Sequence, residues 1–455
     1  MQLRVRSFQL DVRPCRTRLP FRFGAATVTA APLLTARLVV DADGAEAVGL
    51  SGDFAMPKWF DKNPEKSAEE SSEDLVQSAR EAAAAYAGHA GGTAFGIWRD
   101  VYGARVGGTP EDAPDRLVRG FGVALFERAL IDAACRAADA SLLDALRGDA
   151  LGFRPAEVHA DLAGWELASE LPAAQPAGVR LRHTVGGADP LRAEDIAPEA
   201  RVDDGLPVAL EEDIERYGLT SFKVKLIGDP RIDARRLLTL AEFFHGQDIE
   251  LTLDANEQYD ELEELARVLD VVGTTDEGHE LLSRLMYVEQ PLHRARSFEP
   301  ALTAPLAALP VPVILDEADH GVEAFPRALE LGYGGVSVKN CKGVFRALIN
   351  RGICAMRGGF QSAEDLTNVP LLPLHQDLAT LSLLGLEHAE RNGHHYFRGL
   401  DHLTPPEREA ALAHHPELYR SDEDGVFLRI EGGALALSSL AGPGFASAAA
   451  HAALG

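Results

Sequence analysis

The sequence predicts an α/β fold, a (β/α) barrel of the modified TIM type with an α+β capping domain, from two observations. Strand-like runs alternate with helix-like stretches through the second half of the chain, and several of these runs end in an ionisable residue. Strands that alternate with helices pair in parallel, and repetition of the unit favours a barrel. The five clearest runs are SFKVK (221–225), IELTLDAN (249–256), LMYVEQP (285–291), VPVILDE (311–317) and GGVSVK (334–339).

The spacing of these runs supports the barrel. Their terminal charges, from Lys225 to Lys339, follow one another at intervals of about 23 to 35 residues, and a strand with its crossover helix needs about 30. The intervening stretches 233–244 and 260–272 carry apolar residues at the three-to-four-residue period of a helix. The intervals are therefore close to the length of one strand, one helix and two short loops.

Side-chain alternation predicts where the charges point. Successive residues of a strand face opposite sides, so Leu251 and Leu253 would pack on the helices while Asp254 and Asn256 face the interior. The same parity places Lys223 beside Lys225. Because catalytic groups of a barrel lie at the carboxyl ends of its strands, the sequence predicts one polar site at the barrel mouth.

The charges in that site indicate a chemistry. Asp254, Glu289 and Asp316 would repel one another, and an all-oxygen ligand set suits a hard cation such as Mg²⁺. Lysines beside such an ion in a partly dry pocket should have lowered pKa values and act as bases. The chemistry that fits is removal of the proton next to a carboxylate, with the metal holding that carboxylate and stabilising the enediolate.

These five segments together resemble the enolase superfamily, and within it the muconate-lactonizing-enzyme-like subgroup of the mandelate racemase/muconate lactonizing enzyme family. The resemblance implies that Asp254, Glu289 and Asp316 bind Mg²⁺. It implies that Lys225 and Lys339 face each other across the substrate as acid/base catalysts, with Lys223 beside Lys225 as an electrostatic partner. One departure follows Lys339, where NCKGVFRA replaces an expected glycine pair.

The resemblance extends beyond the barrel and predicts the domain organisation. Residues 18–40 are similar to the strand pair that begins the family's capping domain, and residues 121–148 to the helix that leads into its barrel. We expect a capping domain at 1–150, the catalytic barrel at 151–400, and a tail at 401–455 that returns to the cap. In that tail, two short strand-like runs within 425–439 meet at a Gly-Gly turn typical of a hairpin.

Further residues are candidates for substrate contact or for support of the site. Glu364 lies where strand seven should end, with a surface or capping role as the alternative. His388 and Glu390 share parity near strand eight, and a structural histidine or a rim ion pair is the alternative for them. The full candidate set is Asn256, Glu364, His388, Glu390, Arg22, Phe23 and Trp59.

Arg22, Phe23 and Trp59 belong to cap segments that would close over the barrel mouth and exclude water, with cap-to-barrel packing as the alternative for Trp59. His394 and His395 resemble a metal pair. We do not predict a metal there, because adjacent side chains of a strand diverge.

Composition narrows the class of protein. The formal net charge of −26 argues against nonspecific nucleic-acid binding. No run reaches the roughly 18–20 apolar residues of a membrane span, and arginines interrupt the first residues, so we expect no membrane association and a cytoplasmic location. The four scattered cysteines predict reduced thiols. The resemblance suggests a homo-oligomer, either a dimer or an octamer.

The leading functional prediction is a Mg²⁺-dependent racemase or epimerase acting on a small carboxylate substrate, because two opposed lysines allow proton removal on one face and return on the other. The alternative is a lyase of the same superfamily: an acid-sugar dehydratase, an o-succinylbenzoate-synthase-like enzyme or a cycloisomerase. A dipeptide epimerase would carry Asp-x-Asp near strand eight, where this chain has HAERNG. A non-catalytic binding barrel is the third possibility.

Overall fold

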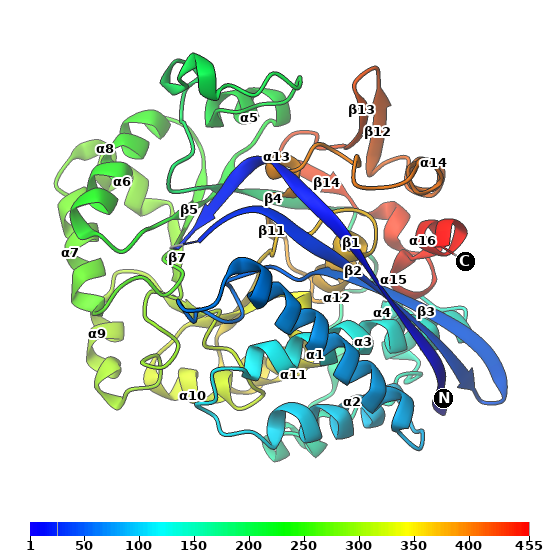
Figure 1. The fold of residues 1–455 in the computed structure, drawn as a ribbon. Coiled ribbons are helices and arrows are strands. Elements are labelled where there is room, and N and C mark those ends of the chain that lie inside the picture. The colour runs from blue at the N-terminus through cyan, green and yellow to red at the C-terminus, as the bar shows by residue number, and fades with distance from the viewer. Residues whose placement is uncertain (25, 455) are drawn as a thin grey trace.

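A computed structural model describes residues 1–24 and 26–454 and contains the expected barrel (Figure 1). Eight parallel strands follow one another in chain order, and the last pairs with the first to close the sheet. They are β4 (Gly178–Val185), β5 (Ser221–Lys225), β6 (Glu250–Asp254), β7 (Leu285–Glu289), β8 (Val313–Leu315), β9 (Gly335–Val338), β10 (Phe360–Ala363) and β11 (His388–Arg391). The predicted fold class is confirmed.

The register of the strands aligns their charged ends. Lys225 on β5 is the strand partner of Asp254 on β6, and Asp254 is in turn the partner of Glu289 on β7. Asp316 and Lys339 follow directly after β8 and β9. All the predicted charges therefore lie at the carboxyl edge of the barrel.

Helices surround the barrel, and both predicted helical stretches are confirmed within α6 and α7. Helix α6 begins at the Asp229 cap, whose side chain accepts from the Arg231 and Ile232 amides, and it buries Leu237 and Phe244. The barrel helices are α5 (Leu210–Tyr217), α6 (Pro230–Phe244), α7 (Leu262–Val272), α8 (Asp276–Ser283), α9 (Thr303–Ala308), α10 (Ala324–Leu331), α11 (Val344–Arg357), α12 (Leu372–Leu383) and α13 (Gly393–Tyr396).

The amino-terminal region forms an antiparallel sheet of β1 (Leu3–Phe23), β2 (Ala26–Ala42) and β3 (Ala45–Phe54), packed on helices. The helices are α1 (Ala68–Gly88), α2 (Ala94–Tyr102), a π-helical turn (Gly103–Gly107), α3 (Arg116–Ala137) and α4 (Leu142–Arg147). Helices α1 and α3 cross so closely that a Cβ at Gly122 would lie 2.3 Å from the Ser78 carbonyl oxygen. Figure 1 shows the long strands β1 and β2 extending from this cap to the barrel.

Short helical turns complete the connections. Three-residue 3₁₀ turns lie at Pro155–Glu157, Ala160–Leu162, Leu167–Ser169, Ala193–Asp195, Pro198–Ala200, Pro300–Leu302, Asn340–Lys342 and Ser438–Leu440. The first three lead from the cap into β4. Among the residues described, the helices include none long and apolar enough to cross a membrane.

The carboxyl-terminal tail contacts helix α3 of the amino-terminal region. Its elements are α14 (Pro405–His414), β12 (Tyr419–Asp422), β13 (Gly425–Leu428), β14 (Ala434–Ala436), α15 (Pro443–Ala446) and α16 (Ala448–Leu454). Strand β13 pairs with β12, whereas β14 pairs antiparallel with the first residues of β4. Both predicted runs are strands, and Glu431 and Ala434 bridge across the predicted Gly-Gly turn, although each strand takes its ladder partner from elsewhere. Asp132 of α3 holds the tail by accepting from Ser447 and contacting His451.

A buried ion pair joins the cap sheet to the barrel. Arg128 of α3 donates to Asp53 of β3 at 2.7 Å and to the Gln376 side chain of α12 at 3.1 Å, and its side chain is fully buried. It also donates to the backbone carbonyl of Asn340, directly after Lys339. One guanidinium therefore links the cap, α12 and the segment that carries a candidate base.

Arg128→Ala is expected to destabilise the protein by about 3–5 kcal/mol, because it leaves the Asp53 carboxylate buried without its partner. Urea denaturation measures the loss. Arg80→Ala, which removes an exposed pair with Glu73, is the matched control and should shift the midpoint little. Equal urea midpoints for the two variants would show that the Arg128–Asp53 ion pair contributes nothing to the stability of the protein.

Candidate active site

The side chain of Lys223 lies at the centre of the barrel mouth, surrounded by carboxylates. Its ammonium is 3.0 Å from Asp254, 2.6 Å from Glu289, 2.8 Å from Glu364 and 2.9 Å from Glu390. It is completely buried. The strands that supply these groups, β5, β6, β7, β10 and β11, converge because their carboxyl ends share one edge of the closed sheet.

Lys225 and Lys339 each pair with a different carboxylate. The Lys225 ammonium lies 2.5 Å from Asp254, and the Lys339 ammonium lies 2.6 Å from Asp316. Their strands are the second and sixth of eight in a closed order, so they stand on opposite sides of the barrel. The two lysines therefore face the mouth from opposite directions.

The pKa of the Lys339 ammonium is raised in the metal-free site. Burial disfavours its charged form, but the negative charges of Asp316 and Glu289 outweigh burial and raise the pKa. The same balance raises the pKa of Lys223 well above its ordinary value. The predicted lowering concerns lysines beside a bound divalent cation, and it remains a prediction for the metal-bound site.

Glu289 lies between the other two predicted metal ligands and has the most unfavourable environment. Burial, and then the charges of Asp254 and Glu364, raise its pKa well above the ordinary value. Neither of its carboxylate oxygens accepts a hydrogen bond, although Lys223 and Lys339 lie near them. A buried carboxylate without hydrogen bonds is costly, and a bound cation relieves that cost.

The three predicted ligands fit a hard cation in their chemistry. Lys223 bridges Asp254 to Glu289, and Lys339 lies between Glu289 and Asp316, so the three carboxylates surround one centre. The ammonium groups stand between the oxygens in this arrangement. An ion that binds here would therefore take over part of the charge compensation that the lysines now provide.

A fourth lysine, Lys342, is an unexpected member of the site. Its ammonium lies 3.3 Å from the Asp316 carboxylate and 3.1 Å from Asp319, and it donates to the Asp316 carbonyl oxygen at 3.0 Å. The 3₁₀ turn Asn340–Lys342 directs it back toward β8. This turn occupies the place of the expected glycine pair. Strand parity could not have found Lys342, because the residue lies beyond the strand.

Cap residues cover the mouth. Phe21, Phe23, Met56 and Trp59 line a small space together with Lys225, Lys339 and Glu390, and its volume is about 10 Å³. The Trp59 ring lies over the Lys339 ammonium, 4.6 Å from it to the ring centroid. Trp59 therefore contacts a candidate base directly, in addition to packing between cap and barrel.

The candidates for substrate contact or for support of the site divide into two groups. Glu364 and Glu390 bind Lys223, and Asn256 lines the small space and donates to Glu317 at 3.2 Å. His388 instead contacts Arg182 and is absent from the lining. Arg22 is exposed, because alternation along β1 turns it away when Phe21 and Phe23 face the barrel.

Sequence reasoning missed a polar layer below Lys223. Arg182 donates to Glu364, Tyr287 donates to Glu364 at 2.8 Å, and Thr184 donates to Glu390 at 2.7 Å. Tyr287 has the same parity as Glu289, so alternation alone could have identified it. Arg182 and Thr184 had no such signal, because the bounds of β4 were not predicted.

A salt-bridge network fastens the cap loop to the rim of the site. Glu257 accepts from Arg294 at 2.8 Å and lies 2.9 Å from the Lys62 ammonium, while Arg294 also donates to the carbonyl oxygens of Trp59 and Phe60. Burial alone would raise the pKa of Glu257, but Arg294 and Lys62 outweigh burial and lower it to about 2. This network holds the loop that carries Trp59.

The Glu257 network should weaken in acid. A carboxyl pKa that is lowered by folding stabilises the protein above its unfolded value of about 4.5, and the stabilisation is lost as pH falls toward about 2. Glu257→Gln should therefore remove part of the pH dependence of the urea midpoint between pH 5 and pH 3. If wild type and variant lose stability in parallel across that window, Glu257 is not the group responsible.

Comparison with known proteins agrees with this architecture. Residues 206–358, which include β5 to β9, match the family model described as enolase C-terminal domain-like. This part of the barrel is therefore similar to an enolase C-terminal domain. No curated protein sequence matches the chain.

Solved structures share the fold of this enolase-like barrel together with its cap. An enolase from Bradyrhizobium complexed with magnesium and mandelic acid is 15% identical, with a TM-score of 0.62 and coverage of 99% of each chain. A dipeptide epimerase from Enterococcus faecalis V583 complexed with Mg and dipeptide L-Leu-L-Tyr is 14% identical, with a TM-score of 0.63, covering 97% of this chain and 99% of its own. A 2-chloromuconate cycloisomerase from Rhodococcus opacus 1CP is 15% identical, with a TM-score of 0.62, covering 98% and 96%.

Proposed function

We propose that the protein is a Mg²⁺-dependent enzyme that removes the proton α to the carboxylate of a small substrate, and that its leading reaction is racemisation or epimerisation. The observation that carries the proposal is the opposition of Lys225 and Lys339 across one covered space. The enolase-like barrel and the carboxylate triad support it.

Two opposed lysines match a two-base reaction. One removes the α-proton from its face of the substrate, and the other, protonated, returns a proton to the opposite face. The pairs Lys225 with Asp254 and Lys339 with Asp316 hold each ammonium in place. Each lysine is thus the acid for one enantiomer and the base for the other.

Asp254, Glu289 and Asp316 would hold the Mg²⁺ ion. When bound, the ion would coordinate the substrate carboxylate and stabilise the negative charge that develops as the proton leaves. The chain's own contribution is to keep three carboxylates converged and to keep Lys225 and Lys339 within reach.

The cap supplies water exclusion and substrate access. A space of about 10 Å³ holds roughly one water molecule and no organic substrate. The segments that carry Phe21, Phe23, Met56 and Trp59 must therefore open for substrate and close afterwards, as lids of this kind do. Their apolar side chains then shield the carbanionic charge from quenching by solvent.

The second candidate is a lyase of the same superfamily, an acid-sugar dehydratase, an o-succinylbenzoate-synthase-like enzyme or a cycloisomerase. Lys223 is an unsuitable acid for a departing group, because four carboxylates enclose it and it does not line the covered space. A dehydratase would have to use Lys225 or Lys339 instead. We also expect a cytoplasmic homo-oligomer, and light scattering that shows only monomer would contradict the oligomer.

The test is incubation of the purified protein with Mg²⁺ in D₂O and a pooled set of N-acylamino acids, dipeptides and acid sugars. Mass spectrometry then reports deuterium at the α-carbon. Exchange without other mass change supports the racemase or epimerase, and loss of water or a new ring supports the lyase. Binding of a ligand with no exchange would support the non-catalytic barrel instead.

A further inference from the structure

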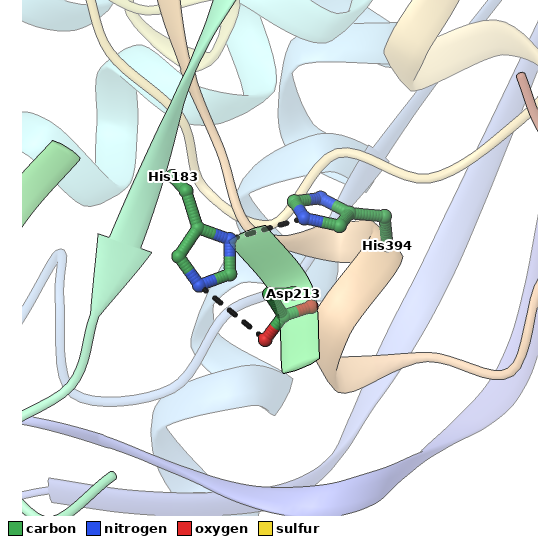
Figure 2. Close-up of side chains that lie close together, drawn as sticks. All are labelled: His183, Asp213 and His394. Atoms are coloured by element: carbon green, nitrogen blue, oxygen red, sulfur yellow. Dashed lines mark hydrogen bonds and ion pairs between the residues drawn. The ribbon is translucent and has the colours of Figure 1, made fainter. Parts of the chain in front are cut away.

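A second polar cluster is formed by His183, Asp213, His394 and His395. Figure 2 shows His183 between His394 and the carboxylate of Asp213, and His395 adds a third imidazole to Asp213 at 2.9 Å. His183 sits on β4 next to Thr184, whose side chain faces the interior and binds Glu390. Alternation along β4 therefore turns His183 outward.

The fold brings these residues together from three segments. His183 comes from β4, Asp213 from α5, and His394 and His395 from the helical turn α13. The sequence-based argument against a histidine pair assumed a strand, and that assumption was wrong. In a helical turn, both rings can approach one carboxylate, and here both lie near Asp213.

The ligand atoms lie close to the spacing that a metal requires. One atom each from His183, Asp213 and His394 lies within 4.8 Å of the others. His183 Nδ1 is 3.1 Å from His394 Nε2, and His183 Nε2 is 3.7 Å from Asp213 Oδ2. In a tetrahedral zinc site, bonds of about 2.0–2.1 Å place neighbouring ligand atoms roughly 3.3 Å apart. Small ring rotations would bring one nitrogen of each histidine to that spacing.

Asp213 is the buried carboxylate of the cluster. Its side chain is about 1% exposed, and its Oδ2 lies 3.7 Å from His183 Nε2 and 2.9 Å from His395 Nδ1. A buried ionised carboxylate is ordinarily hydrogen-bonded or bound to a metal. A neutral imidazole beside a carboxylate is the form that binds metal.

We propose that His183, Asp213 and His394 bind one divalent transition-metal ion of the zinc class, with His395 orienting the Asp213 carboxylate. Two imidazoles and a carboxylate suit zinc and related ions, whereas Mg²⁺ prefers oxygen ligands alone. A cavity of about 30 Å³ borders His394 and Tyr217. It has room for a water molecule beside His394.

The position of the cluster indicates a structural role. Arg18 of β1 donates to the carbonyl oxygen of His395 at 2.8 Å and to Asp204 at 2.6 Å. The Phe21 ring packs on Tyr396, with ring centroids 4.4 Å apart. An ion at this point would therefore stiffen the base of the β1 segment that carries Phe21 and Phe23 over the barrel mouth.

The test uses full-length protein stripped with a chelator and then supplied with excess Mg²⁺ and one equivalent of Zn²⁺. We expect one zinc per chain retained after desalting, a zinc-edge X-ray absorption spectrum with imidazole ligands, and a raised Tm. His183→Gln and His394→Gln should each weaken zinc binding at least ten-fold, by competition with a chromophoric chelator. His279→Gln, on exposed α8, is the matched control and should bind zinc as the wild type does.

Two results would overturn the proposal. One is a wild-type spectrum with oxygen ligands only, which would place the zinc on carboxylates at the mouth. The other is failure to retain zinc, which would leave the cluster as a chain of hydrogen-bonded histidines. Because the spectrum is taken on the wild type, it decides the matter even if a variant fails to fold. A failure of the proposed α-proton chemistry would leave this result unchanged.

Discussion

Lys339→Ala is expected to lower α-proton exchange by at least 10²–10⁴-fold, and Lys225→Ala to do the same from the opposite face. Because the two lysines stand on opposite sides of the barrel, each variant should lose exchange with one enantiomer more severely than with the other. Exchange of each separate enantiomer in D₂O, followed by NMR, measures this asymmetry. A double variant that retains turnover would end the two-base proposal.

The lysine variants need controls for charge and for folding. Lys339 also compensates Asp316, so its loss leaves a buried carboxylate less well paired. Lys339→Arg keeps the charge but holds its proton too tightly to act as a base, and we expect it to be folded and inactive. Lys66→Ala makes the same alanine substitution at an outer salt bridge with Asp61 and Asp74, and it should leave exchange intact.

Glu289→Gln is expected to weaken Mg²⁺ binding by at least ten-fold, because it removes the carboxylate that lies between Asp254 and Asp316. Isothermal titration calorimetry measures the affinity. Glu431→Gln, at an exposed carboxylate, is the matched control. An affinity equal to that of the wild type would remove Glu289 from the ligand set.

The same variant should behave differently when Mg²⁺ is absent. The pKa of Glu289 is raised by burial and by its acidic neighbours, so its contribution to metal-free stability is greatest below about pH 4.5 and is lost as pH rises. Glutamine carries no charge, and it should therefore make the metal-free protein more stable near neutral pH. A thermal melt without metal that shows lower stability for Glu289→Gln would contradict this account of the site.

Local patterns in the sequence were sufficient to predict the barrel and the charged residues at its strand ends. The two-residue period of β6 and the three-to-four-residue periods of α6 and α7 are properties of neighbouring residues, and they predicted these elements directly. The same parity placed Asp254 and Glu289 on one face. The partners of the tail strands could not be predicted, because a short run such as β14 has no signal that distinguishes pairing with β13 from pairing with β4.

By itself, then, the sequence determined the strand-helix repeat, the order of the charged strand ends and their meeting at one edge. Only the tertiary structure decided which charged groups from different elements lie in contact. The tertiary structure placed Lys342 in contact with Asp316, and it placed Trp59 over Lys339. It also brought His183, Asp213 and His394 together on the outer side of the barrel wall. The physical reason is distance along the chain. Periodicity reports which face a side chain takes within one element, whereas these contacts join elements that only the closed barrel and its cap bring together.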